Sequence, residues 1–63
     1  MKRRLVIKAI KDAGYKWNRG DGDHDVFEKE GRQPVQVPKH REINHNTARE
    51  ILAAAGVKDS LKK

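Results

Sequence analysis

Apolar residues near the start of the chain recur at one-, three- and four-residue steps, which is the spacing of one helix face. They are Leu5, Val6, Ala9, Ile10 and Ala13. Charged residues occupy most of the positions between them, so the pattern predicts an amphipathic helix over residues 2–13. Gly14 follows it, and glycine commonly ends a helix because it tolerates a left-handed backbone.

The middle of the chain alternates between apolar and polar residues, which is the period of a strand with one buried face. Three strands are predicted, at residues 15–19, 24–29 and 33–38. Residues 20–23 read Gly-Asp-Gly-Asp and predict a loop, and Glu30 with Gly31 predicts a tight turn. Pro34 and Pro38 lack a backbone N–H, so we expect the third strand to be short or to lie at an edge.

A second helix is predicted to begin at Asn46 or Thr47. Asn46 suits the N-cap position, and Thr47 with Glu50 matches the T-x-x-E capping box. The predicted buried stripe of this helix consists of Ala48, Ile51, Leu52 and Ala55. Gly56 is expected to end the helix, and Val57 to make the apolar contact that often follows such an ending.

The order helix, three strands, helix predicts an α+β fold of the form α-β-β-β-α. We expect a three-stranded antiparallel sheet with two helices on one face, in a single domain over residues 1–63 with a frayed basic tail at 58–63. The expected core comprises Leu5, Ala9, Ile10, Ala13, Trp17, Phe27, Val35, Val37, Ile51, Leu52 and Ala55. Because Val26 and Phe27 are adjacent in one strand, one of them must point away from the helices.

Charge points to a polyanionic partner. The chain holds 15 Lys and Arg against 9 Asp and Glu, for a net charge of +6 and a pI of about 10.0, which favours contact with nucleic acid. Lys8 and Lys11 interrupt the apolar residues of a would-be signal peptide, and no run approaches the roughly 18 apolar residues of a membrane span. We therefore expect a cytoplasmic protein without a membrane partner.

The acidic loop resembles part of a calcium site but does not complete it. Asp21, Asp23 and Asp25 match the first three ligand positions of a calcium-binding loop. Val26 and Arg32 then stand where that loop needs glycine and glutamate. The chain also has no cysteine, which excludes a disulfide and a thiolate zinc site. No metal or cofactor is predicted.

Several segments, taken together in order, resemble the HicA family of bacterial toxins. That family shows a glycine, a small residue and a histidine before an apolar strand, as in residues 22–27 here. Residues 35–38 match a strand that ends in proline, and residues 46–57 match a threonine-led helix closing with alanine, glycine and an apolar residue. Asp23 stands where the family usually has Ser or Thr. The resemblance implies a fold like the double-stranded-RNA-binding domain, ribonuclease activity on messenger RNA and inhibition by a HicB-type antitoxin.

The resemblance also implies that His24 is the catalytic residue, positioned by a loop containing Gly22 and Asp23. A histidine can take the proton of a ribose 2′-hydroxyl and later return one, without a metal ion. The cationic residues expected to contact RNA are Lys16, Arg19, Lys39, His40 and Arg41. From spacing alone, His24 reads as an ordinary solvated residue at the start of a strand, and His40 and His45 compete for its role.

Two alternatives stay open from the residues alone. The same fold could bind double-stranded RNA without cutting it, and the Asp-rich loop favours that interpretation. A DNA-binding regulator is disfavoured because neither helix has a helix-turn-helix partner. Trp17 and Tyr15 could stack on bases, but we expect Trp17 in the core because burial of a large ring dominates the stability of a small domain.

Overall fold

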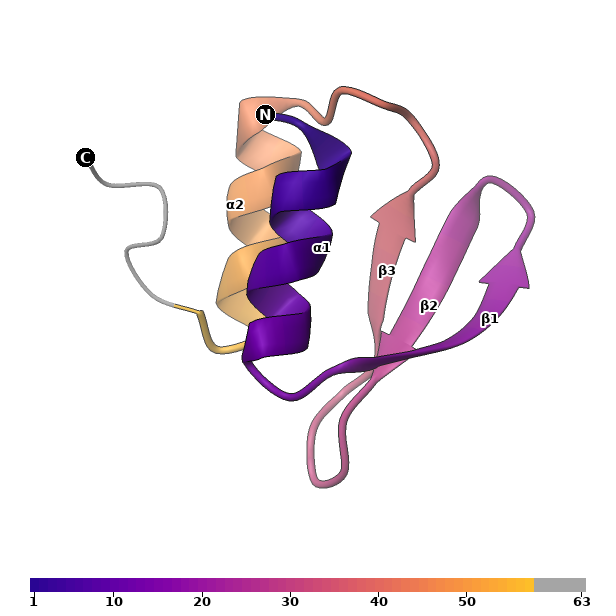
Figure 1. Cartoon of the computed structure of the whole chain (residues 1–63), viewed down its shortest axis with the longest axis vertical. Helices are drawn as coiled ribbons and strands as arrows, with labels where there is room; N and C mark the ends of the chain where they lie inside the picture. The colour runs from indigo at the N-terminus through magenta and orange to yellow at the C-terminus, as the bar shows by residue number, and fades with distance from the viewer. Residues whose placement is uncertain (58–63) are drawn as a thin grey trace.

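The computed structural model describes residues 1–57, and the predicted tail at 58–63 lies outside the described residues. The elements are α1 (Arg3–Asp12), β1 (Lys16–Asp21), β2 (His24–Glu28), β3 (Val35–Pro38) and α2 (His45–Ala54). The three strands form one antiparallel sheet in the order β1-β2-β3, and the two helices lie side by side against β3 (Figure 1). The predicted α-β-β-β-α architecture is confirmed. Within residues 1–57, neither helix has the length and apolar character needed to cross a membrane.

The hairpin between β1 and β2 is tighter than the glycine pattern predicts. The expected loop at 20–23 is reduced to Gly22 and Asp23, because Gly20 and Asp21 continue β1 and pair with the start of β2. A two-residue hairpin turn needs a positive φ, and Gly22 supplies it with φ +63°.

The N-cap of α2 also differs from the prediction. Asn44, rather than Asn46, is the N-cap, and its side-chain oxygen accepts a hydrogen bond from the backbone N–H of Asn46 at 2.8 Å. This bond satisfies one of the backbone donors that a helix start leaves free. The helix therefore begins at His45, slightly earlier than the capping-box pattern indicates.

The connection between β2 and β3 holds the ends of both helices. Lys29 Nζ donates to the carbonyl of Ala13, just after α1, at 2.6 Å. Arg32 Nη2 donates to the carbonyl of Ala54, the last residue of α2, at 3.3 Å. A cation at the C-terminal end of a helix also complements the helix dipole. The single connection thus fixes the two helices relative to the sheet.

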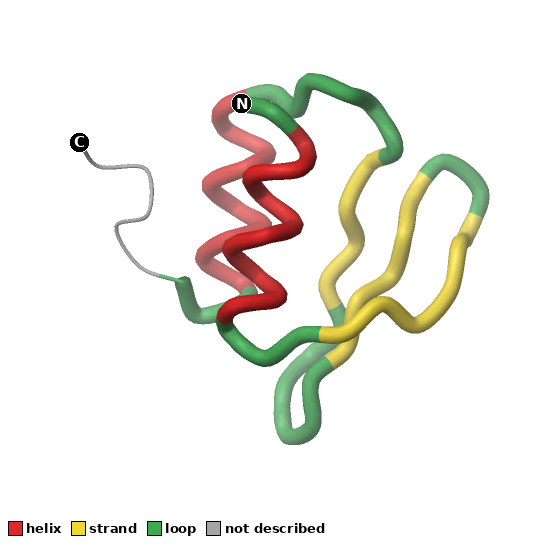
Figure 2. The backbone as a smooth tube through the Cα atoms, in the orientation of Figure 1, coloured by secondary structure: helices red, strands yellow, loops and turns green. Residues whose placement is uncertain are grey.

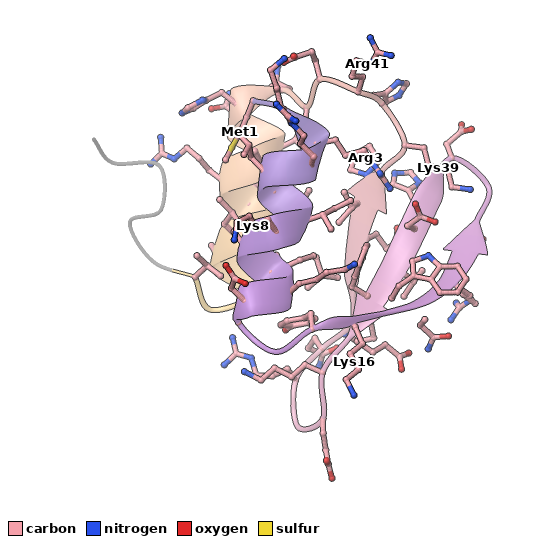
Figure 3. All side chains as sticks on the ribbon, in the orientation of Figure 1. Met1, Arg3, Lys8, Lys16, Lys39 and Arg41 are labelled. Carbon is pink, nitrogen blue, oxygen red and sulfur yellow. The ribbon has the colours of Figure 1, made fainter. Side chains whose placement is uncertain are left out.

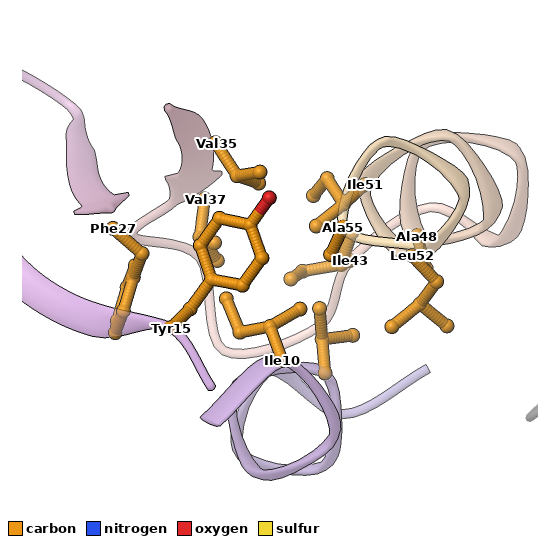
Figure 4. Close-up of a cluster of buried hydrophobic side chains, with 11 residues drawn as sticks. Ile10, Tyr15, Phe27, Val35, Val37, Ile43, Ala48, Ile51, Leu52 and Ala55 are labelled. Carbon is orange, nitrogen blue, oxygen red and sulfur yellow. The ribbon is translucent and has the colours of Figure 1, made fainter. Parts of the chain in front are cut away.

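The core lies between the helices and the sheet face turned toward them, which we call the near face (Figure 4). Its buried residues are Val6, Ile10, Tyr15, Phe27, Val35, Val37, Ile43, Ala48, Ile51, Leu52 and Ala55. Most of the predicted core is thereby confirmed. Tyr15 is buried as well, and its hydroxyl donates to the carbonyl of Gln33 at 3.3 Å, which satisfies the polar end of the ring.

Two predicted core residues are exposed, so the prediction is wrong for both. Leu5 is 47% exposed because the buried stripe of α1 is centred on Val6 and Ile10, one step around the helix. Trp17 is 56% exposed although it lies on the near face, opposite the buried Phe27. The helices pack over β3, whereas β1 extends away from them at the opposite edge of the sheet (Figure 2).

A β-bulge in β1 sets which residues share a face. Trp17 pairs with Phe27 and Arg19 pairs with Val26, so Asn18 is the extra residue. Because Phe27 belongs to the core, the adjacent Val26 points to the opposite, far face of the sheet. Arg19 shares that far face with Val26, while Trp17 stays on the near face.

Candidate functional site

His24 is the first residue of β2 and directly follows the hairpin turn. In the sheet it lies opposite Asp21 of β1 and opposite Pro38 of β3. The backbone N–H of Lys39 donates to the carbonyl of Asp23 at 2.8 Å, which attaches the turn to the end of β3. The histidine is therefore held by a paired strand on each side.

The alternation of β2 places His24 on the far face together with Val26. Asp21 and Arg19 lie on the same face, because directly opposed residues of neighbouring strands share a face. The histidine is half-buried. Within residues 1–57, no side-chain hydrogen bond or ion pair engages its imidazole. The ring nitrogens are therefore available for a hydrogen bond with a ligand.

The cations predicted to surround His24 do not form one cluster. Arg19 lies on the far face, opposite Val26 and therefore two residue pairs along the sheet from His24. Lys16 lies opposite Glu28, which is about 13 Å along β2 from His24 at the usual rise per residue. Figure 3 shows Lys16 at one end of the sheet, and Lys39 and Arg41 toward the other.

A second group of cations lies between the start of α1 and the segment after β3. A hollow of about 500 Å³ is lined by Lys2, Arg3, Arg4, Lys39 and Arg41, which we call the cationic hollow. All five lining residues are positively charged, so the hollow attracts anionic groups such as phosphate. Lys39 and Arg41 were predicted to contact RNA, whereas the other three were missed. His40 lies between the two predicted residues and is exposed.

The missed cations reach the hollow because two distant segments pair. Lys2 and Glu42 form an isolated antiparallel β-bridge. The backbone N–H of Arg3 donates to the carbonyl of Arg41 at 2.9 Å. The run Lys2-Arg3-Arg4 was a visible signal in the sequence, but its partner segment was not.

Asp25 connects the hairpin to the cationic hollow. Its carboxylate accepts hydrogen bonds from Arg3 Nη2 and, at 3.1 Å, from Trp17 Nε1, and it lies 3.9 Å from Lys39 Nζ. Arg3 also donates through Nε to the carbonyl of Pro38 at 2.7 Å. The sequence offered no signal for this network, because it depends on strand register and on the approach of α1.

The environment of Asp25 favours its charged form. The hydrogen bond from Trp17 lowers the pKa of Asp25 below its ordinary value of 3.8, and partial burial opposes this effect. The positive charges of Lys39 and Arg3, with the hydrogen bond from Arg3, lower the pKa further. Asp25 is therefore a carboxylate at neutral pH and is well placed to orient the cations around it.

The aspartates of the turn do not gather with His24 into a metal-binding set. In the part of the chain that the structure describes, no three His, Asp or Glu side chains come together as a group that would hold a metal ion. Asp25 points to the near face, whereas Asp21 shares the far face with His24.

Comparison with known proteins finds a matching family model and a similar solved structure. A family model described as HicA toxin of bacterial toxin–antitoxin systems matches residues 3–57, a range that includes every helix and strand. Among solved structures, the chain is similar to a protein in a toxin–antitoxin complex from Streptococcus pneumoniae, with 33% sequence identity and a TM-score of 0.79. The match covers 89% of this chain and 97% of that one. Comparison with curated proteins gives no significant match.

Proposed function

The chain belongs to the HicA toxin family of bacterial toxin–antitoxin systems, and on that premise we propose that it is an endoribonuclease that cleaves messenger RNA through His24. The observation that best supports a catalytic role for His24 is its position in the structure. The residue is half-buried, its imidazole has no side-chain partner within residues 1–57, and it is the first residue of a strand paired on both sides. Strand pairing fixes the backbone of His24, and its ring nitrogens have no side-chain partner among the described residues, which leaves them available for general acid–base chemistry.

The proposed reaction is an internal transfer on the ribose-phosphate backbone. The His24 imidazole takes the proton of a 2′-hydroxyl, and the resulting oxygen forms a bond to the adjacent phosphorus. The bond to the 5′-oxygen breaks, and the imidazolium returns its proton to that leaving oxygen. Arg19, on the same face as His24, is the cation best placed to stabilise the charge on the phosphoryl oxygens. This route needs no metal ion or cofactor.

Membership of the HicA family suggests which protein inhibits the reaction. The solved relative comes from a toxin–antitoxin complex, and we extend this to a HicB-type antitoxin as the partner of the present chain. With a net charge of +6, the toxin is expected to meet an acidic patch on that partner. Both messenger RNA and the antitoxin would be met in the cytoplasm.

The test compares histidine variants on labelled RNA in the presence of EDTA. Wild-type protein is expected to produce fragments, His24→Ala to produce none, and His45→Ala, a change of an exposed histidine at the start of α2, to cut like wild type. Circular dichroism confirms that each variant is folded. Undiminished cutting by folded His24→Ala contradicts the catalytic assignment. If wild-type protein retards RNA in a gel without cutting it, the alternative of a non-catalytic RNA-binding module holds instead.

A further inference from the structure

Trp17 is a large aromatic residue on the surface, and its ring is held in place. The side chain is 56% exposed, yet its Nε1 donates to Asp25 Oδ1 at 3.1 Å. This bond engages the edge of the indole and leaves the faces of the ring for other contacts. A fixed, exposed aromatic face is the feature on which proteins stack nucleobases.

The indole is close to the cationic hollow. Arg3 and Lys39 line the hollow, and both also pair with Asp25, the acceptor of the indole N–H. Gly20 lies beneath this network, since a Cβ added there would lie 3.2 Å from Lys39 Nζ and 3.5 Å from Asp25 Oδ1. The near face of the hairpin therefore carries an aromatic ring and two cations that share one carboxylate.

We propose that Trp17 stacks on an unpaired nucleobase of RNA, with the phosphate of that strand held by Arg3 and Lys39. The inference rests on the proposed function for the identity of the ligand as RNA, and it specifies that the RNA is single-stranded at this position. A paired base inside a duplex has both faces covered and is not available to the indole.

The surroundings of Trp17 favour RNA over a protein partner. The hot spots of protein–protein interfaces cluster in well-packed patches in which Lys, Glu and Asp are depleted. Among the described residues, Leu5 is the other exposed large apolar side chain, and it lies on α1 rather than on the hairpin. Trp17 is instead accompanied by Arg3, Lys39 and Asp25. Charge complementarity therefore points to a polyanion with flat apolar groups.

The position of His24 favours single-stranded RNA over duplex RNA. His24 and Asp25 are adjacent in β2 and point to opposite faces of the sheet. A strand bound at Trp17 must pass around the hairpin to reach the imidazole. A flexible single strand can follow this path, whereas a stiff duplex cannot.

Trp17 is the sole tryptophan of the chain, so its fluorescence reports directly on stacking. The experiment uses the full chain carrying His24→Ala, which removes the proposed catalytic residue and is expected to keep the RNA intact. A single-stranded RNA oligonucleotide is expected to quench the fluorescence to saturation. The same oligonucleotide annealed to its complement, and inorganic polyphosphate, are expected to quench it little.

Affinity is measured in parallel by the fluorescence anisotropy of labelled RNA. Adding Trp17→Ala is expected to weaken binding of the single strand by about five- to 100-fold. Trp17→Phe is expected to recover much of that loss, because an aromatic face remains. Leu5→Ala removes the other exposed apolar side chain, on α1, and is expected to leave RNA affinity unchanged.

Three results overturn the proposal. The first is that single-stranded RNA does not bind, or that it binds without changing the fluorescence of Trp17. Another is a duplex that quenches as strongly as the single strand. The third is a folded Trp17→Ala variant that keeps its RNA affinity and loses affinity for the antitoxin, which would assign the ring to the protein partner. Quenching by a single strand in a protein whose wild type never cuts RNA supports the stacking site and contradicts only the catalytic proposal.

Discussion

Trp17 and Asp25 lie on neighbouring strands, and the indole N–H of the first donates to the carboxylate of the second at 3.1 Å. The same carboxylate pairs with Arg3 at the start of α1. One acidic side chain, 17% exposed and opposite the core residue Val37, thus joins the hairpin to the helical layer at the edge of the apolar core.

Replacing Asp25 with Asn is expected to lower stability in a pH-dependent way. The folded-state pKa of Asp25 lies below 3.8, so its carboxylate stabilises the fold above that pH. This contribution is lost as the pH falls through the lower folded-state pKa. Thermal unfolding of wild type and Asp25→Asn should therefore differ most near neutral pH and converge in acid. The matched control is Asp12→Asn, whose exposed pair with Lys8 should matter little at any pH. A difference in thermal stability between wild type and Asp25→Asn that stays unchanged in acid would refute the stabilising role of the Asp25 charge.

Two apolar residues of α1 should respond very differently to truncation. Ile10 is 0% exposed, and Ile10→Ala is expected to cost about 2–5 kcal/mol, since it removes transfer free energy and leaves a cavity. Leu5 is 47% exposed, and Leu5→Ala should stay within about 0.5 kcal/mol. Urea titration of both variants measures the free energy of unfolding. Equal losses would mean that the buried stripe of α1 is wrongly placed.

Lys29 should stabilise the end of α1. Its ammonium donates to the carbonyl of Ala13 at 2.6 Å, so Lys29→Met is expected to cost about 1 kcal/mol while keeping most of the side-chain bulk. Lys8→Met is the control, because Lys8 forms an exposed pair within the same helix. Denaturation in urea compares the two, and similar stabilities would show that the contact contributes nothing.

The cationic hollow should contribute to RNA affinity without regard to sequence. Arg4→Ala and Arg41→Ala, each made in the His24→Ala protein, are expected to weaken binding to different single strands by similar factors. Each should also reduce the slope of log affinity against log salt by about 0.7, the value for one lost phosphate contact on a single strand. Arg49→Ala, on α2 outside the hollow, is the control. Salt slopes identical to that of the His24→Ala protein would remove the hollow from the RNA interface.

Periodicity was sufficient to predict the element order, because each helix and strand carries a local apolar pattern that agrees with its burial. Val35 and Val37 in the third strand, and Ile51 and Leu52 in the second helix, are buried as expected. The burial predicted for Trp17 is wrong for a different reason. Its position on the near face fits a half-buried strand, but local pattern does not show how far across the sheet the helices reach.

Contacts between segments distant in the chain could not be predicted from the sequence either. Lys39 and Arg41 were recognisable as candidate RNA contacts from charge alone. Their association with Arg3 depends on a bridge between segments about forty residues apart in the chain, from Lys2 to Glu42. The role of Asp25 depends in turn on that association. Features built from contacts distant in the chain stay hidden until the register of the strands is known.

The extra residue in β1 has a consequence for how this chain can change in length. Asn18 makes Trp17 and Arg19 point to opposite faces, although two positions separate them. Deleting it would leave Trp17 and Arg19 as adjacent residues of a regular strand, still opposite Phe27 and Val26, so both would keep their faces. A single insertion or deletion elsewhere between Tyr15 and the turn would exchange the faces of the residues on one side of it. Asn18 is therefore a position at which β1 can lose one residue without exchanging the two faces of the sheet.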